Sequence, residues 1–284
     1  MRIFSLLPST TEILFAVGAG DEVVGVTFEC DAPAEARTRT IVSTSTLREG
    51  LSPREIDDAV AAAVANGEDL YRLDAGVLAG LDADLVVTQD LCAVCAVDVA
   101  TVDDALTHLG CTADVLTVDP HTLEEVLESV TTIGSAVGRE EAASSLVAGL
   151  RARLDAVRSR VAGRTRPRVA VLEWTDPPYL PGHWIPEMVE LAGGVCVLGR
   201  PGERSARTTF EDVAAARPDL VVVAPCGYDR AGAQAQADAL VAAGALPPGV
   251  RVHAVDADGM WARPGPRLVD GVEELAGVLH PVSG

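Results

Sequence analysis

Residues 73–87, LDAGVLAGLDADLVV, and residues 210–222, FEDVAAARPDLVV, are two copies of one pattern that decides the fold. In each copy a short helical stretch leads into a run of aliphatic residues through an Asp-Leu-Val-Val step. A helix that leads into a buried aliphatic strand is the repeating unit of a parallel α/β sheet. The duplication therefore predicts two similar α/β halves in one chain.

Other segments repeat in the same order. Residues 2–6 and residues 168–172 are both predicted to be the first strand of a half. Residues 12–18 and residues 187–194 both combine an apolar helical stretch with a closing glycine. The second half of the chain therefore restarts the architecture of the first.

A long helix is predicted between the halves, over residues 138–165. At 1.5 Å per residue it would reach about 35–40 Å, the span of a small domain. We therefore expect two parallel-sheet, Rossmann-like lobes, residues 1–137 and 166–284, joined by this helix, with a ligand cleft between them. The apolar residues at helical spacing are Leu146, Leu150, Leu154, Val157 and Val161.

Composition excludes several partners. The net charge of −20 argues against nucleic acid or an anionic membrane as partner. No apolar run approaches the roughly 18–20 residues that a membrane span needs. The opening residues contain no charged leader followed by an apolar core, so we expect a cytoplasmic protein.

Residues 173–194, EWTDPPYLPGHWIPEMVELAGG, concentrate aromatic residues in a chain that is only 4% aromatic. Prolines stiffen this stretch, which follows the strand at residues 168–172. Because loops at strand ends commonly bind ligands, we interpret it as one wall of a binding site. The alternative is a proline-rich loop whose tryptophans fill a hydrophobic hole.

The order of elements resembles the substrate-binding proteins of ABC importers whose lobes are joined by a single long helix. The resemblance rests on LLPSTTEILFAVGAGDEVVGVT (residues 6–27), the doubled segment, the mid-chain helix and EMVELAGG (residues 187–194). These relatives bind cobalamin, haem or iron-siderophores. The loop WTDPPYLPGHW (residues 174–184) is similar to the Pro-Pro-Tyr loop of the cobalamin-binding members.

This resemblance implies a non-catalytic binder of a cobalamin-like corrinoid, with haem or a siderophore as alternative ligands. Such a protein would serve as a carrier, store or sensor, or as the binding component of an importer. Its partner would be an ABC transporter or a cobalamin-dependent enzyme. Acidic residues that dock exported relatives onto the transporter match Asp74 and Glu211, and the additional residues 50–70 are placed where they could cover Asp74.

Aromatic residues in predicted strand-end loops of the second lobe are candidates for stacking on a flat tetrapyrrole, with ordinary packing as the alternative. His183, in the same stiff loop, could be an axial ligand to cobalt or iron, or could hydrogen-bond the ligand. The aromatic candidates are Trp174, Tyr179, Trp184, Tyr228 and Trp261.

Polar residues at other strand ends are candidates for the rim of the ligand. Glu29, Gln89 and Asp90 of the first lobe could hydrogen-bond its amides. Arg263 and Arg267 of the second lobe could bind carboxylates or a phosphate. The alternative for each of these residues is a solvated side chain.

Cys92 and Cys95 follow a predicted strand and lie one turn apart. This spacing suits metal binding, redox exchange, a thiolate ligand to cobalt, or simple packing at the start of a helix. Cys30 and Cys226 are also predicted near strand ends and could converge on the pair. A metal- or cluster-dependent enzyme that uses Cys92 and Cys95 is therefore the competing functional hypothesis.

Overall fold

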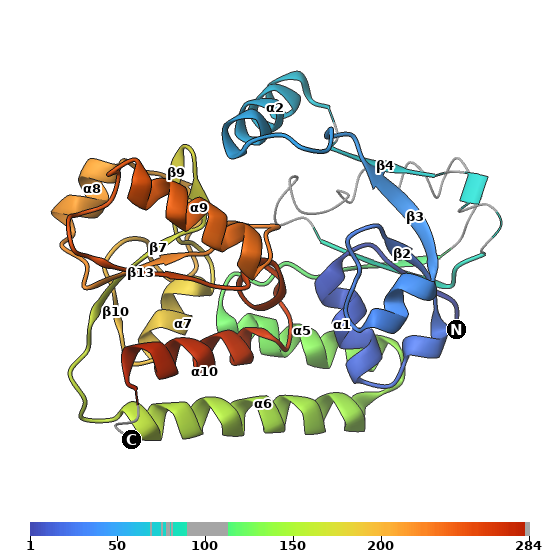
Figure 1. Ribbon diagram of the computed structural model, residues 1–284. Coiled ribbons are helices and arrows are strands. Elements are labelled where there is room, and N and C mark those ends of the chain that lie inside the picture. Colours follow the sequence, from blue (N-terminus) through green and yellow to red (C-terminus); the bar gives the residue numbers. More distant parts are fainter. Residues whose placement is uncertain (69, 75, 78–79, 81, 90–112, 282–284) are drawn as a thin grey trace. The chain divides into compact units, whose positions relative to one another are not determined.

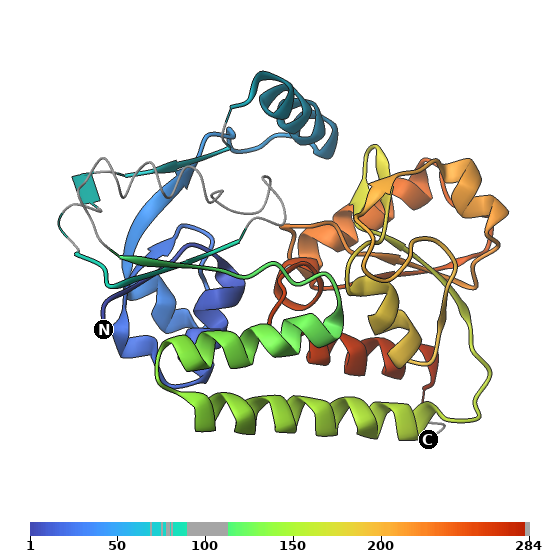
Figure 2. The same ribbon diagram turned by 180° about the vertical axis from the view of Figure 1, so that it is seen from behind.

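The computed structural model describes residues 1–284 except residues 69, 75, 78–79, 81, 90–112 and 282–284 (Figures 1 and 2). The chain divides into two compact units. Unit 1 contains Met1–Pro120 and Leu127–Val147, and unit 2 contains His121–Val126 and Ala148–Gly284. Each unit is an α/β structure, as the duplicated pattern predicts.

Unit 1 is built on a six-stranded sheet in the order β4-β3-β2-β1-β5-β6. All neighbouring strands are parallel except β3 and β4, which are antiparallel. The strands are β1 (Ile3–Ser5), β2 (Val23–Thr27), β3 (Thr40–Ser45), β4 (Tyr71–Leu73), β5 (Leu85–Thr88) and β6 (Asp114–Thr117). The predicted aliphatic segment of the first copy is β5, which lies beside the first strand β1.

Helices α1 (Pro8–Ala16), α2 (Pro53–Asn66) and α5 (Leu123–Ala136) and the 3₁₀ turns η1 (Gly20–Glu22) and η2 (Ala34–Thr38) follow these strands. Phe4 and Val86 of the sheet share a buried hydrophobic cluster with Ala63 of α2. Ala63 is thus the buried residue through which α2 joins the hydrophobic cluster of this sheet.

The helix starts are partly as the sequence predicts. Ser52 and Glu55 form a capping box at the start of α2, because the serine hydroxyl accepts from the Glu55 amide and the glutamate accepts from the Ser52 amide. The same Ser-x-x-Glu spacing at Ser9 and Glu12 predicts a second capping box, which the structure does not form. Helix α1 begins at Pro8, so both residues lie inside the helix, where they are buried.

Unit 2 has a four-stranded parallel sheet in the order β10-β7-β12-β13. Its strands are β7 (Arg168–Leu172), β10 (Val195–Cys196), β12 (Leu220–Val223) and β13 (Arg251–Ala254). A small antiparallel sheet, β11-β9-β8, is formed by β8 (Trp174–Thr175), β9 (Pro178–Leu180) and β11 (Ala206–Arg207). A single residue, Glu173, separates β7 from the small sheet, which begins at the carboxyl edge of the parallel sheet.

Helices cover both faces of the parallel sheet (Figure 1). On one face, α8 (Phe210–Ala215) and α9 (Arg230–Ala242) share a buried cluster with β7 and β12. On the other face lie α7 (Ile185–Leu191) and α10 (Leu268–Leu279), and a π-helical turn, η3 (Asp258–Ala262), precedes α10. Unit 2 is therefore a three-layered α/β/α structure.

The internal repeat extends to individual hydrogen bonds. In unit 1 the Arg2 amide donates to the Asp84 carboxylate at 2.7 Å, and the Asp84 amide donates to the Arg2 carbonyl at 2.8 Å. In unit 2 the amides of Arg168 and Asp219 make the same two bonds at 2.7 and 2.8 Å. The arginine Nε of each copy also donates to the carbonyl two positions before the aspartate, at 3.1 Å in both.

The predicted long helix is α6 (Glu140–Val161), which has 22 residues. The division between the units falls inside this helix, between Val147 and Ala148, and also inside α5. The first residues of α5 belong to unit 2, where the Leu123 amide donates to the Glu187 carboxylate at 2.7 Å. Thr122 and Glu125 cap this helix start reciprocally, because the Glu125 amide donates to the Thr122 hydroxyl and the Glu125 carboxylate accepts from the Thr122 amide.

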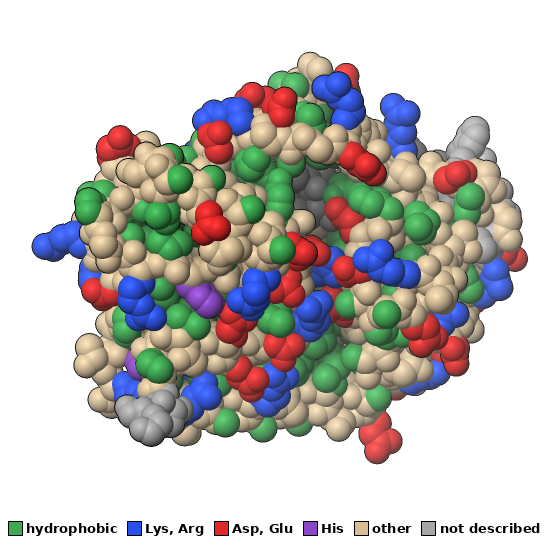
Figure 3. Space-filling model, viewed as in Figure 1, with side chains coloured by type: hydrophobic (Ala, Val, Ile, Leu, Met, Phe, Trp, Pro, Cys, Tyr) green, Lys and Arg blue, Asp and Glu red, His purple; other side chains and the backbone are tan. Residues whose placement is uncertain are grey.

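The surface carries charges of both signs. Arginine and acidic side chains are interspersed over the face that Figure 3 shows. Within the described part of the chain, no helix is long and apolar enough to cross a membrane.

Candidate functional site

The carboxyl edge of the parallel sheet of unit 2 brings three strand-end loops together. Glu173 follows β7, and its carbonyl accepts from the Cys226 amide of the loop after β12 at 3.1 Å. In that same loop, the Tyr228 carbonyl accepts from the Asp258 amide, beyond β13, at 3.0 Å. Ligands of open α/β sheets commonly bind at this edge.

The small sheet presents three polar or aromatic side chains on one face. Trp174 of β8 is directly opposite Tyr179 of β9, and Tyr179 is directly opposite Arg207 of β11. Directly opposite residues of antiparallel strands project from the same face. We call these three residues, together with Tyr228, the aromatic surface.

The members of the aromatic surface contact one another. The Trp174 and Tyr228 rings have centroids 5.8 Å apart at an interplanar angle of 58°. The Arg207 Nε donates to the Tyr179 hydroxyl at 2.9 Å, and the guanidinium carbon lies 5.8 Å from the centroid of the tyrosine ring. Arg207 is exposed and the three rings are half-buried, so each ring combines a packed edge with an accessible part. Burial raises the pKa of Tyr228.

The opposite side of β8 anchors this surface. Thr175 is buried, and its hydroxyl bonds the Gln236 side chain of α9. Alternation along a strand places Thr175 on the face opposite to Trp174. The aromatic surface is thus held on a rigid part of unit 2.

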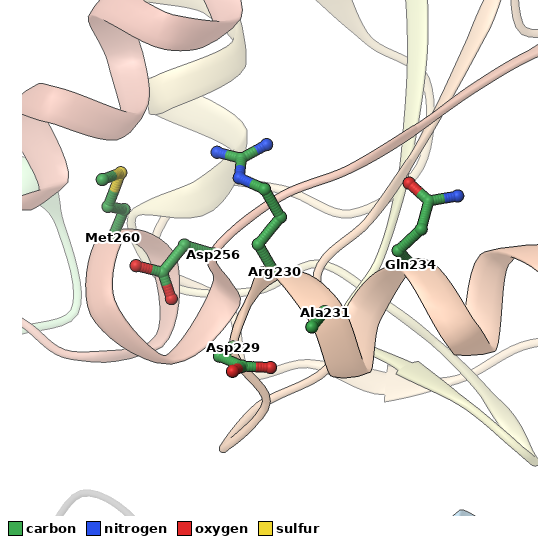
Figure 4. A pocket seen from close by; sticks show the side chains of 6 residues that line it. All are labelled: Asp229, Arg230, Ala231, Gln234, Asp256 and Met260. Atoms are coloured by element: carbon green, nitrogen blue, oxygen red, sulfur yellow. The ribbon is translucent and has the colours of Figure 1, made fainter.

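A pocket of about 620 Å³ lies at the start of α9 (Figure 4). We call it the α9 pocket. The side chains of Asp229 and Arg230 leave the start of α9 in different directions. The lining residues are Asp229, Arg230, Ala231, Gln234, Asp256 and Met260.

The cation in the lining of the α9 pocket is already bound within the protein. Arg230 donates to the Glu274 carboxylate at 2.6 Å and to the Ala254 carbonyl at 3.0 Å. Glu274 also accepts from His253 at 3.0 Å. The bonds from His253 and from Arg230 lower the pKa of Glu274 to about 2, so it is ionised beside the arginine at neutral pH.

Two of the predicted stacking residues belong to the core of unit 2. Trp184 is 4% exposed and Trp261 is fully buried. The Trp184 indole donates to the Trp261 carbonyl at 2.8 Å, which fixes the two residues against each other. Both rings therefore serve ordinary packing, which was the alternative to stacking on a ligand, and neither presents a face to a ligand.

His183 lies inside the loop that carries it. Its φ is +50°, its amide donates to the Glu203 carbonyl at 2.6 Å, and its carbonyl accepts from the Gly202 amide at 3.0 Å. Its ring centroid lies 5.6 Å from that of His121 and 5.5 Å from that of Trp184. The Nε2 atom is buried and has no hydrogen-bond partner within the described residues. This placement does not present Nε2 to an incoming metal centre.

The environment of His183 predicts a pH dependence. Burial, together with His121 and Arg204, lowers the pKa of His183 below the ordinary 6.5. The pKa of this histidine is lower in the folded than in the unfolded protein, so the unfolded chain binds the proton first as the pH falls. The folded state therefore keeps its full stability at a pH above the unfolded pKa and loses stability as the pH falls below it. We expect His183→Asn, which tolerates the left-handed backbone, to reduce the loss of stability between about pH 7.5 and about pH 5. Urea unfolding of both proteins at the two pH values measures this difference.

A matched variant tests the origin of the effect. His121→Gln removes one group that lowers the pKa of His183, so it should also reduce the acid loss. Equal acid sensitivity in the wild type and in His183→Asn would contradict the assignment.

The two predicted arginines are bound to carboxylates of the same loop. Arg263 is 8% exposed and bonds both oxygens of Asp258, at 3.2 and 2.6 Å. The Arg267 guanidinium donates to the Oδ2 atom of Asp256 at 3.4 Å. Arg263 thus stabilises the π turn η3 and leaves little guanidinium surface for a ligand.

The candidate residues of unit 1 that the structure describes, Glu29, Gln89 and Cys30, differ in their burial and in their partners. Glu29 accepts from the Tyr71 hydroxyl at 3.4 Å, and the Tyr71 ring lies 6.0 Å from that of Phe28, which is 37% exposed. Gln89 is 4% exposed, which limits its access to a ligand. Cys30 is buried, with its sulfur 3.0 Å from the Thr11 hydroxyl.

The predicted metal ligands lie only partly within the described chain. There, no group of three His, Cys, Asp or Glu side chains could hold a metal ion. Cys226 is exposed in the loop after β12, whereas Cys30 is buried in unit 1. Asp90, Cys92 and Cys95 lie outside the described residues.

Sequence reasoning missed several residues of this site. Arg207 is on a strand of two residues, which is too short to produce an alternating pattern. Asp229 and Asp256 follow predicted strands within a few residues, so the strand-end rule that selected Tyr228 could have selected them too.

Residues 77–243, more than half of the chain, match the periplasmic binding protein family. The chain belongs to this family, whose members are substrate-binding proteins and not enzymes. This membership confirms the expectation of a non-catalytic binder and excludes the enzyme hypothesis based on Cys92 and Cys95.

Individual relatives cover nearly the whole chain. The uncharacterized ABC transporter substrate-binding lipoprotein YvrC of Bacillus subtilis (strain 168) is 27% identical over 287 residues, which span 99% of this chain and 80% of YvrC. The periplasmic vitamin B12 binding protein BtuF of Vibrio cholerae is 22% identical with a TM-score of 0.66, over 98% of this chain and 96% of BtuF. The periplasmic haem-binding protein RhuT from Roseiflexus sp. RS-1 is 22% identical with a TM-score of 0.71, over 99% of this chain and 98% of RhuT. These likenesses confirm the predicted fold class.

Proposed function

We propose that this chain binds a cobalamin-like corrinoid as the substrate-binding component of an ABC importer. The aromatic surface of unit 2 carries this proposal. It offers three adjacent ring systems on a stiff support, which suits a large flat ligand with an apolar face. The solved vitamin B12 binding protein BtuF has the same fold over 98% of this chain.

An absorbance titration with cyanocobalamin tests this function. We expect a shift of the corrinoid spectrum with near-stoichiometric binding, confirmed by titration calorimetry. Trp174→Ala should weaken the affinity by roughly tenfold or more, because a buried aromatic contact typically supplies more than about 1.4 kcal/mol. No binding by the wild type at tens of micromolar would refute the proposal.

Haem is the second candidate ligand, and one observation favours it. The Tyr179 hydroxyl accepts from Arg207 at 2.9 Å, and a tyrosine oxygen is one of the protein ligands that haem iron takes. Similar structures include haem-binding proteins such as RhuT. Tyr179 would then bind the iron through its oxygen, and Arg207 would stabilise the negative charge that this oxygen carries.

Tyr179→Phe separates the two ligands, because it removes the hydroxyl and keeps the ring. A corrinoid binder should keep its affinity for cyanocobalamin in this variant, whereas a haem binder should lose most of its haem affinity. Side-by-side titration of the wild type with both ligands identifies the preferred one.

The proposed transporter contact involves one acidic residue on each unit. Asp74 is exposed, so α2 does not cover it, contrary to the expectation from the additional residues. Glu211 is exposed in the first turn of α8. Charge reversal of either residue should weaken co-purification with the transporter without changing ligand affinity. Cell fractionation tests this role: a location outside the cytoplasm supports the importer component, whereas the cytoplasmic location expected from the sequence supports a carrier, store or sensor instead.

A further inference from the structure

We infer that Gly232 is a positioning residue for ligand binding. Because it has no side chain, α9 leaves room for the ring of Tyr228, which lies where it contacts Trp174. This inference rests on the proposed function, since it says how one member of the aromatic surface is held in place for stacking.

Gly232 lies in the first turn of α9, where the backbone does not require a glycine. Its amide donates to the Asp229 side chain at 2.8 Å, and its φ does not lie in the left-handed region. Glycine destabilises a helix relative to alanine, because its backbone loses more conformational freedom on folding. The reason for a glycine at this position therefore lies outside the helix backbone.

The space beside Gly232 is filled by the Tyr228 side chain. An added Cβ atom at position 232 would lie 2.8 Å from Cδ1 of Tyr228 and 3.4 Å from its Cβ atom. Carbon atoms in favourable contact are about 3.5–4.0 Å apart, so the first of these distances is a clash. Any side chain at position 232 would therefore displace the Tyr228 ring.

The main chain at Tyr228 is bonded on both sides. Its amide donates to the Pro225 carbonyl at 3.1 Å, and its carbonyl accepts from the Asp258 amide at 3.0 Å. The next residue, Asp229, caps α9. An added Cβ atom would therefore move the ring rather than the backbone, and this movement would change the contact with Trp174, whose ring centroid is 5.8 Å away.

The same face of α9 also holds the other ring of the pair. Gln236 follows Gly232 by four residues, so the two residues are neighbours on one face of the helix. The Gln236 side chain bonds the hydroxyl of Thr175, which is next to Trp174 in β8. This face of α9 therefore sets the spacing of the ring pair, since it anchors the strand of one ring and admits the other.

Titration of the wild type and of Gly232→Ala with cyanocobalamin tests the inference. We expect the variant to bind about tenfold more weakly, because the displaced ring disturbs the surface on which a flat ligand stacks. Its melting temperature should stay within about 3 °C of the wild type, since the gain in helix propensity opposes the loss of ring packing.

Gly277→Ala is the matched control in the same unit. It adds the same methyl group to α10, where a Cβ atom would meet nothing within 4 Å. It should leave the affinity for cyanocobalamin unchanged.

A double-mutant cycle isolates the contribution of the Tyr228 ring. In a Tyr228→Ala background, Gly232→Ala should change the affinity by less than about twofold, because the ring that the Cβ atom meets is absent. Near-ultraviolet circular dichroism of the ligand-free proteins gives a second readout. Tyr228→Ala and Gly232→Ala should both change the aromatic signal, whereas Gly277→Ala should not.

Three outcomes overturn the inference: wild-type affinity in Gly232→Ala, a tenfold loss that persists in the Tyr228→Ala background, or the same loss in Gly277→Ala. If Gly232→Ala alone does not fold, the double variant with Tyr228→Ala should fold, and failure of both overturns the inference as well. A wild type that binds neither cyanocobalamin nor haem refutes the proposed function, and the role of Gly232 in binding with it. An unchanged aromatic signal in Gly232→Ala refutes the placement of the ring alone.

Discussion

Trp261→Ala is expected to lower the free energy of unfolding by about 3–5 kcal/mol, as is typical when a buried tryptophan is truncated. Its side chain is completely buried, and its carbonyl accepts from the Trp184 indole. The substitution leaves a cavity that the surrounding core of unit 2 cannot fill without moving Trp184. Urea unfolding followed by circular dichroism measures the change.

Trp174→Ala is the matched control, since it removes the same side chain from a half-buried position in unit 2. It should cost much less stability while it weakens ligand binding. Comparable destabilisation by the two variants would contradict the division between core and ligand-facing tryptophans.

Gly182→Ala is expected to destabilise unit 2 by about 3 kcal/mol or more, at the upper end of the usual cost of overpacking. A Cβ atom at this position would lie 2.2 Å from the Ser205 amide nitrogen and 2.7 Å from the Glu203 carbonyl oxygen. Both are main-chain atoms, and the His183–Glu203 hydrogen bond holds this backbone in place. The loop therefore cannot relax as a flexible side chain would.

Gly149→Ala provides the opposite case. Gly149 lies within α6, and a Cβ atom there would meet nothing within 4 Å. The substitution should stabilise the protein by about 0.5–1 kcal/mol, because alanine loses less backbone entropy than glycine in a helix. Thermal unfolding of both variants should move the melting temperature in opposite directions. A neutral Gly182→Ala would show that the two loop segments are not held in contact.

The duplicated halves could be predicted because parallel strands that are buried on both faces have continuous runs of aliphatic residues in the sequence. The two Asp-Leu-Val-Val segments are β5 and β12, each beside the first strand of its sheet. The long helix was predictable from its apolar spacing. The limits of the units were not, because contacts between distant segments decide that residues 121–126 belong to unit 2.

The site was less predictable than the fold. A tryptophan beside a strand end can face a ligand or the core, and the choice for Trp184 depends on a bond to Trp261, 77 positions away. Arg207 enters the site through a two-residue strand that pairs with Tyr179, 28 positions earlier. Such pairings are tertiary contacts that leave no local pattern. The strand-end rule nevertheless located Trp174, Tyr179 and Tyr228, which the structure brings together.

The division inside α5 has a practical consequence for dissecting the protein. Unit 2 draws residues 121–126 from a part of the chain that is separated from Ala148 by a stretch of unit 1. A fragment that begins at Ala148 would leave the Glu187 carboxylate without the Leu123 amide and the His183 ring without that of His121. A single cleavage therefore cannot release unit 2 intact, and a recombinant form of this half needs the six-residue segment supplied by a redesigned connection.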